Sequence, residues 1–141
     1  MRVLLDTNVL VSGLASRTAA PGALLHAWRA GIFELVVSDP LITEVARTLQ
    51  KPYFLKRLTN EQITQAIILL YTEGQRTVIN VTVTGIASHT EDDLVLAAAV
   101  SGHADYLVTG DRDLQKLTLF QGVTVLSPRA FLDLITPNLE V

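Results

Sequence analysis

Short apolar runs alternate along this chain with longer stretches in which apolar residues recur at helical spacing. The apolar runs are typical of buried strands: VLL at 3–5, ELVV at 34–37, TVI at 77–79, YLV at 106–108 and VTVL at 123–126. The longer stretches predict helices over 20–30, 39–50, 60–71, 92–101 and 128–135. Strands that alternate with helices favour a parallel sheet covered on both faces. We therefore expect a single-domain α/β fold over residues 1–136, with a central parallel β-sheet of about five strands flanked by helices and a short C-terminal tail at 137–141.

Two of the predicted strands end on an aspartate. Asp6 follows the first apolar run directly, and Asp111 follows the fourth after Thr109 and Gly110. In an open parallel sheet, ligands bind outside the carboxyl ends of the strands, at the point where the strand order reverses. If the chain winds outward from its first strand and later returns to the other side, the two aspartates flank one crevice. A lone aspartate at such a position is otherwise a turn former or a helix cap.

Further acids begin the helix at 92–101. Glu91, Asp92 and Asp93 suit the positive end of a helix dipole, and Thr90 with Asp93 also fits a capping box. Three adjacent like charges repel one another, however, and a bound cation would relieve that repulsion. Several carboxylates without a neighbouring cation are what Mg²⁺ or Mn²⁺ requires. Glu44 differs, because it lies off the apolar stripe of its helix and periodicity alone makes it a solvated surface residue.

The composition limits the chemistry that these acids can take part in. The 141 residues include no cysteine, which excludes disulfides, thiolate zinc and cysteine nucleophiles. His26, His89 and His103 share no spacing, so we interpret them as surface or hydrogen-bonded residues and not as ligands. No apolar run approaches the ~20 residues of a membrane span, and no signal-peptide pattern is present, so we expect a cytoplasmic protein without a membrane partner.

The charge pattern bears on nucleic-acid binding. The net charge of −3 argues against non-specific coating of nucleic acid, which depends on many contacts from lysine and arginine to phosphate. One local basic window contains no acid and holds four cations and two aromatic residues: Arg47, Lys51, Tyr53, Phe54, Lys56 and Arg57. This window either contacts a nucleic-acid substrate, with Arg47, Lys51 and Arg57 as the candidate binding residues, or is a solvated helix face.

Four segments of the chain resemble the PIN-domain nucleases, in particular the VapC-like branch, the toxins of toxin–antitoxin pairs. The segments are LLDTNVLVSG, LITEVARTL, EDDLVLAAAVSGHADYLVTGDRDL and GVTVLSPRAFL, and the resemblance spans nearly the whole chain. It implies four catalytic, metal-binding acids: Asp6, Glu44, Asp93 and Asp111. Asp93 fits better than Asp92 because Leu96 and Ala97 follow it at the family's spacing. Asn8, Thr109 and Asp92 are then candidates for supporting residues that orient the ligands. Asp113 ranks below these acids, because it can cap a short helix at 113–117.

The resemblance also implies an activity. It is that of an endoribonuclease that cleaves single-stranded RNA with a Mg²⁺ or Mn²⁺ cofactor, which lowers the pKa of a bound water. The implied partners are the RNA substrate, an antitoxin protein and a second copy of the chain. Two alternatives remain open. One is a non-catalytic PIN-like module that binds RNA or protein, and the other is a metal-dependent nuclease acting on DNA, since a metal and phosphate site does not itself read the 2′-OH.

Overall fold

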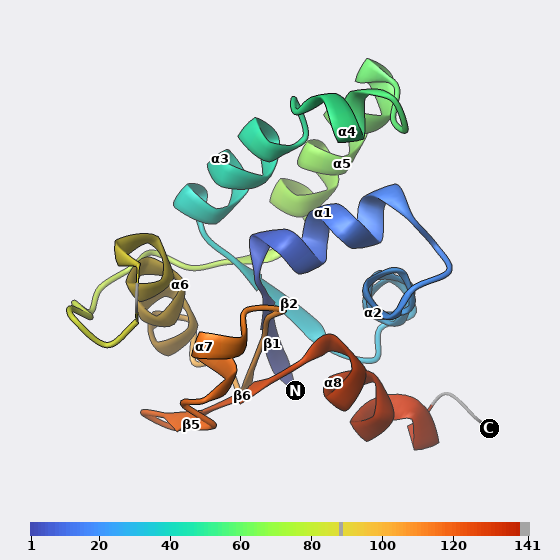
Figure 1. The fold of residues 1–141 in the computed structure, drawn as a ribbon. Helices are drawn as coiled ribbons and strands as arrows, with labels where there is room; N and C mark the ends of the chain where they lie inside the picture. The colour runs from blue at the N-terminus through green and yellow to red at the C-terminus, as the bar shows by residue number, and fades with distance from the viewer. Residues whose placement is uncertain (88, 139–141) are drawn as a thin grey trace.

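The computed structural model describes residues 1–87 and 89–138, and these residues form a six-stranded sheet with helices on both faces (Figure 1). The strands are β1 (Arg2–Leu5), β2 (Glu34–Val37), β3 (Gln75–Arg76), β4 (Tyr106–Val108), β5 (Leu119–Phe120) and β6 (Val123–Leu126). The helices are α1 (Thr7–Ala15), α2 (Ala20–Arg29), α3 (Asp39–Thr48), α4 (Pro52–Leu55), α5 (Asn60–Glu73), α6 (Thr90–Ser101), α7 (Arg112–Gln115), α8 (Pro128–Ile135) and the 3₁₀ helix η1 (Thr136–Asn138). The predicted α/β fold is confirmed.

The strand order places β1 and β4 side by side at the centre of the sheet. The order is β3-β2-β1-β4-β6-β5, and Val3 pairs with Tyr106 in the parallel β1–β4 ladder. The chain steps from β1 outward to β3, then crosses back to β4 on the other side of β1. α6 lies on one side of the sheet, and α2 and α8 lie on the other (Figure 1). The strand order therefore reverses between β1 and β4, which is the arrangement predicted for Asp6 and Asp111.

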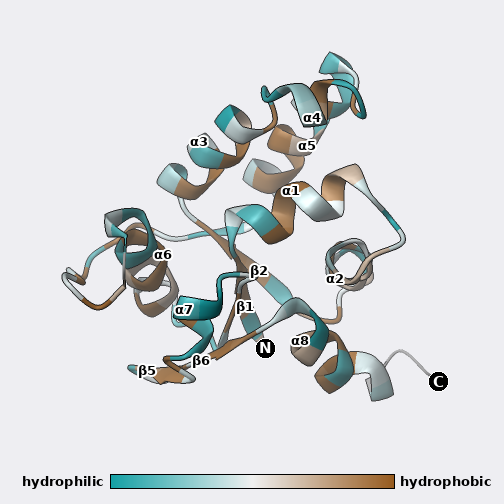
Figure 2. Ribbon diagram, viewed as in Figure 1, coloured by the Kyte–Doolittle hydropathy of each residue, from teal (hydrophilic) through white to brown (hydrophobic). Residues whose placement is uncertain are grey.

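The hydrophobic core lies on both faces of the central strands. Leu4, Leu35 and Leu107 are completely buried, and Phe131 of α8 packs edge-on against Phe33 with ring centroids 5.5 Å apart. Each such side chain contributes roughly 1.5–3 kcal/mol by its burial. Figure 2 shows that the hydrophobic residues gather on the central strands, whereas α7 at the surface is hydrophilic. In the described part of the chain, no helix is both long enough and apolar enough to span a membrane.

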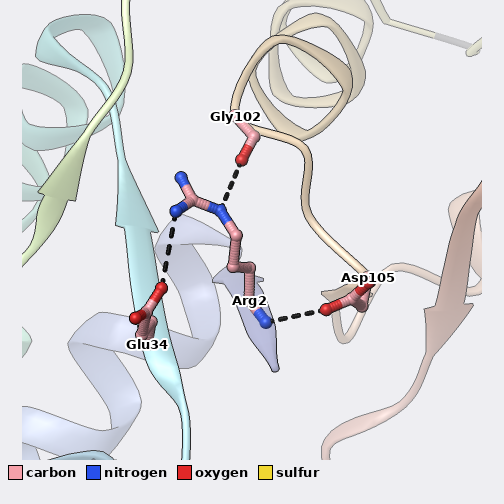
Figure 3. Close-up of polar contacts among 4 residues, drawn as sticks. All are labelled: Arg2, Glu34, Gly102 and Asp105. Carbon is pink, nitrogen blue, oxygen red and sulfur yellow. Dashed lines mark hydrogen bonds and ion pairs between the residues drawn. The ribbon is translucent and has the colours of Figure 1, made fainter.

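Arg2, the first residue of β1, has polar contacts with Glu34, Gly102 and Asp105 (Figure 3). Its Nε donates to the carbonyl oxygen of Gly102 at 2.8 Å, and its backbone nitrogen donates to Asp105 Oδ2 at 2.9 Å. Its Nη1 lies 3.4 Å from Glu34 Oε2 on β2. These contacts hold the connection between α6 and β4 against the start of β1.

Two helices depart from the sequence prediction. α1 was not predicted, because its buried residues face several directions and leave no clear amphipathic period. Instead, Asp6 caps α1 and starts it directly after β1. α4 was also not predicted, because Pro52 ends a helical pattern but in fact occupies the first turn of a new short helix, where proline is well tolerated.

The strands at the two edges of the sheet also differ from the prediction. β3 lies at 75–76 and not at 77–79, although the backbone nitrogen of Thr77 still donates to the Val37 carbonyl at 2.8 Å. β5 was missed, because it is only two residues long and forms a tight antiparallel hairpin with β6 in which Gln121 and Gly122 have positive φ. The predicted tail at 137–141 begins inside η1, and residues 139–141 lie outside the described part of the chain.

Candidate active site

Asp6 is fixed at the carboxyl end of β1 by two hydrogen bonds to its own side chain. The Thr7 backbone nitrogen donates to Oδ1 at 2.8 Å, and the Thr109 hydroxyl donates to Oδ2 at 2.8 Å. Burial raises the pKa of the Asp6 carboxyl; the two hydrogen bonds lower it and the nearby charge of Asp111 raises it further. Asp6 thus caps α1, as expected for a lone aspartate after a strand. Its buried carboxylate charge is also destabilised, and it lies where the strand order reverses between β1 and β4.

Asp111 lies across from Asp6 at the end of β4 and is tied to it through Thr109. Asp111 Oδ1 accepts from the backbone nitrogens of Asp113 and Leu114 at 2.8 and 3.4 Å, so it caps α7. Its backbone nitrogen donates to the Thr109 hydroxyl oxygen at 3.1 Å, and the same hydroxyl donates to Asp6. Thr109 is completely buried and orients both acids. The prediction that Asp113 caps this helix is wrong, because Asp111 does so.

Asp92 in the first turn of α6 is the third acid that interacts with this pair. Its pKa is raised to about 6, first by desolvation and then by the negative charges of Asp111 and Asp6. A side-chain hydrogen bond with Asp111 raises the pKa of Asp92 further, whereas His89 lowers it. Carboxylates that share a site without a cation behave in this way, because like charges at short range disfavour ionisation.

These acids line one cavity of about 150 Å³. Its charged or titratable lining residues are Asp6, Glu44, His89, Glu91, Asp92 and Asp111. Glu44 is half-buried, and it lines this cavity together with Asp6, although periodicity alone assigned it to the surface. Asn8 lines the cavity as an exposed residue.

Asp93 lies elsewhere. Its Oδ1 accepts from the backbone nitrogen of Ala87 at 2.8 Å and its Oδ2 from that of Gly85 at 3.1 Å, and only 7% of the residue is exposed. It is not among the residues that line the cavity. Successive residues of an α-helix point about 100° apart, so the side chain of Asp93 leaves α6 in a different direction from that of Asp92. The structure therefore groups Asp92, and not Asp93, with Asp6 and Asp111.

Three polar lining residues were not selected from the sequence as site residues: Thr7, His89 and Glu91. His89 directly precedes the acidic first turn of α6, and this adjacency was the available signal. Thr7 carried no signal of its own, because a threonine after a strand is an ordinary cap residue. Its Oγ1 is buried and has no hydrogen-bond partner among the described residues, which is an uncommon state for a buried hydroxyl.

The cavity suits a divalent metal ion in the chemistry of its donors. Carboxylate oxygens and an unpaired hydroxyl are ligands that hard cations accept, and the coupled acids would be relieved by positive charge. The donors do not form a complete site as they stand: within residues 1–87 and 89–138, no three acidic or histidine side chains make a group that could hold an ion. Binding would require Asp92 and Asp111 to exchange their mutual hydrogen bond for the metal.

A larger groove of about 500 Å³ adjoins the acidic cavity and shares Glu44, Glu91 and Val95 with it. The groove lies between α3 and α6, and Arg47 is at its edge. Arg57 is farther along the basic window, where its Cζ lies 3.6 Å from the centroid of the Tyr53 ring. Of the three basic candidates, Arg47 is thus the one that lines a groove continuous with the acids.

The fold and the cavity define an α/β domain with a carboxylate-lined crevice at its topological switch point. The model of the PIN domain matches residues 2–113, and this chain belongs to the PIN-domain family. No curated protein matches the chain. Among solved structures, the chain is similar to a chain of the crystal structure of VapBC2 from Rickettsia felis bound to a DNA fragment from their promoter, with 15% sequence identity and a TM-score of 0.62. That match covers 90% of this chain and 98% of the other, and it shows that the two share a fold.

Proposed function

We propose that this chain is a divalent-metal-dependent endoribonuclease that hydrolyses single-stranded RNA. The observation that carries the proposal is the electrostatic coupling of Asp6, Asp92 and Asp111 in one cavity of a PIN domain. Such coupling disfavours three ionised carboxylates on their own and favours them around a cation. Perturbed carboxyl groups in a cleft are a feature of functional sites.

Asp6, Glu44, Asp92 and Asp111 would hold Mg²⁺ or Mn²⁺, because their carboxylates meet in the cavity. A divalent ion held by these residues would supply the lowered pKa of water and the neutralisation of phosphate charge that hydrolysis requires. Thr109 keeps Asp6 and Asp111 in a fixed orientation by its two hydrogen bonds. Asn8 lines the same cavity and would contact water or substrate there.

A nucleic-acid substrate is proposed because a cation borders the groove beside the acids, and RNA is proposed over DNA because of the VapC-like resemblance of the sequence. Arg47 is there, and Lys51 and Arg57 continue the basic window onto α4 and beyond. Phosphates of a bound strand would contact these cations, while the scissile phosphate lies at the acids. A nuclease that cuts DNA and a PIN-like module that binds without cutting are the alternatives. The five carboxylates that line one cavity favour cleavage over binding alone.

The toxin of a toxin–antitoxin pair is the proposed biological role. The likeness to a chain of VapBC2 supports it, as does the VapC-like resemblance of the sequence. An antitoxin protein is then a partner, a homodimer is an expected assembly and the cytoplasm is the expected compartment. The reading frame next to this gene would reveal whether an antitoxin is encoded there.

A cleavage assay tests the proposal. Purified protein is incubated with labelled single-stranded RNA and with DNA of matching sequence, in Mg²⁺, Mn²⁺ or EDTA. We expect RNA cleavage with either metal and none with EDTA, and a loss of at least ~100-fold in Asp6→Asn and Asp111→Asn, because each removes a ligand charge. Asp133→Asn removes a carboxylate that is about two-thirds exposed, on α8, and is the matched control. Cleavage of DNA alone, or undiminished cleavage in both site variants, would refute the proposal.

A second assay tests the basic window. Replacing Arg47, Lys51 and Arg57 together by alanine should weaken RNA binding and reduce the magnitude of the slope of log affinity against log salt by about two to three. Each phosphate contact that is lost reduces the number of counterions released on binding. A triple variant with the same loss of charge elsewhere, at Arg29, Lys116 and Arg129, should leave both quantities near those of the parent protein. Equal effects of the two triple variants would show that the window is a solvated face.

A further inference from the structure

We infer that Asp93 is a positioning residue, which fastens the segment before α6 to the first turn of that helix, while its neighbour Asp92 supplies the carboxylate of α6 to the acidic cavity. The part of this inference that concerns metal binding rests on the proposed function. It departs from the ligand set that the sequence resemblance implies, because that set contains Asp93.

The contacts of Asp93 account for both of its carboxylate oxygens. Gly85 and Ala87 each donate a backbone N–H to a different oxygen, and the residue is almost entirely buried. The carboxylate therefore links α6 to Gly85, which lies eight positions before Asp93 in the chain. Gly85 has a φ of 69°, a conformation that glycine adopts readily.

The fastened segment leads directly into the cavity wall. It is followed by His89, the N-cap residue of α6, and then by Glu91 and Asp92, and these three residues line the cavity. Asp93 lies in the first turn of α6, so its two hydrogen bonds tie Gly85 and Ala87 to the turn that presents Asp92 to Asp6 and Asp111. Turning Asp93 towards the cavity would break both of these partly buried hydrogen bonds and leave the N–H groups of Gly85 and Ala87 without their acceptors.

Amide hydrogen exchange followed by NMR tests the fastening itself. In the metal-free protein, we expect the amides of Gly85 and Ala87 to be protected, and at least one of them to exchange at least ~10-fold faster in Asp93→Asn, because the asparagine NH₂ group replaces one of the two acceptor oxygens and cannot accept a backbone N–H. Asp92→Asn should leave both rates within about twofold. Adding saturating Mg²⁺ to the parent protein should also leave the two amides protected. Loss of their protection on adding Mg²⁺ would show that Asp93 leaves the loop for the metal and would overturn the inference, and this measurement needs no variant.

Metal affinity provides the second measurement. In titrations of the full chain with Mn²⁺, Asp92→Asn should weaken binding by at least ~10-fold, whereas Asp93→Asn should weaken it by less than ~3-fold, since a supporting residue acts only through the ligand that it places. RNA cleavage by Asp93→Asn should recover at high Mn²⁺, and that of Asp92→Asn should not. A stronger loss of affinity in Asp93→Asn than in Asp92→Asn would overturn the inference. If the parent protein bound no Mn²⁺, the proposed function would fail, while the exchange rates would still decide the role of Asp93.

Discussion

Replacing Asp92 by asparagine should stabilise the metal-free protein near neutral pH. Asp92 is partly exposed, yet its carboxyl interacts unfavourably with the charges of Asp111 and Asp6, and its pKa is raised from 3.8 to about 6. Asparagine is neutral and nearly the same size, and its amide group can still donate to Asp111. The substitution therefore removes repulsion and desolvation without opening a cavity.

The magnitude follows from the shift in pKa. A pKa shift of about two units corresponds to at most about 3 kcal/mol of destabilisation. Because solvent screens this partly exposed group, we expect its effect on the free energy of unfolding to be about 1 kcal/mol. Between pH 4 and 6 the folded protein keeps the Asp92 proton while the unfolded chain has lost it, so the free energy of unfolding contributed by this group falls as the pH rises through that window. The advantage of Asp92→Asn should thus be near zero at pH 3.5 and reach about 1 kcal/mol above pH 7.

Urea unfolding of the metal-free parent and variant at pH 3.5, 5, 6 and 7.5 measures this difference. Asp133→Asn, which removes an exposed carboxylate that lies 4.0 Å from Arg129, is the control and should change stability by less than about 0.5 kcal/mol at every pH. A loss of stability in Asp92→Asn at pH 7.5, or a gain that does not depend on pH, would refute the reasoning. Adding Mn²⁺ should then reverse the order of stability, because the parent protein gains binding energy that the variant lacks.

Other contacts give further expectations. Thr109→Val should lower the free energy of unfolding by about 1–3 kcal/mol, because it leaves the backbone N–H of Asp111 without its acceptor, whereas Thr109→Ser should restore most of this loss; equal stability of the two variants in urea would contradict it. Arg2→Ala should cost about 1 kcal/mol through the lost bond to Gly102, as thermal unfolding would show, and an unchanged Tm would argue against that tie. Glu44→Gln should alter the metal-free stability by less than about 0.5 kcal/mol yet reduce Mn²⁺ affinity, and unchanged Mn²⁺ binding in calorimetry would place this residue outside the metal site.

The sequence by itself determined the class of fold and the meeting of the two strand-end acids. Apolar runs of strand length between amphipathic stretches indicate buried parallel strands, and this local signal located β1, β2, β4 and β6. The general rule for open parallel sheets then placed Asp6 and Asp111 at one crevice. The pattern of apolar residues did not predict α1, because a helix that is buried on several sides shows no periodic apolar face.

Only the tertiary structure decided which acid of α6 joins that crevice. Asp92 and Asp93 are adjacent in sequence and identical in type, and spacing relative to Leu96 and Ala97 favoured the second. Their environments are set by contacts that no local pattern encodes: Asp92 interacts with Asp111, nineteen positions along the chain, and Asp93 accepts two backbone N–H groups from the preceding loop. The rotation of α6 about its axis is fixed by how it packs on the sheet. A turn of about 100° separates the two side chains, so that packing determines which of them faces the other acids.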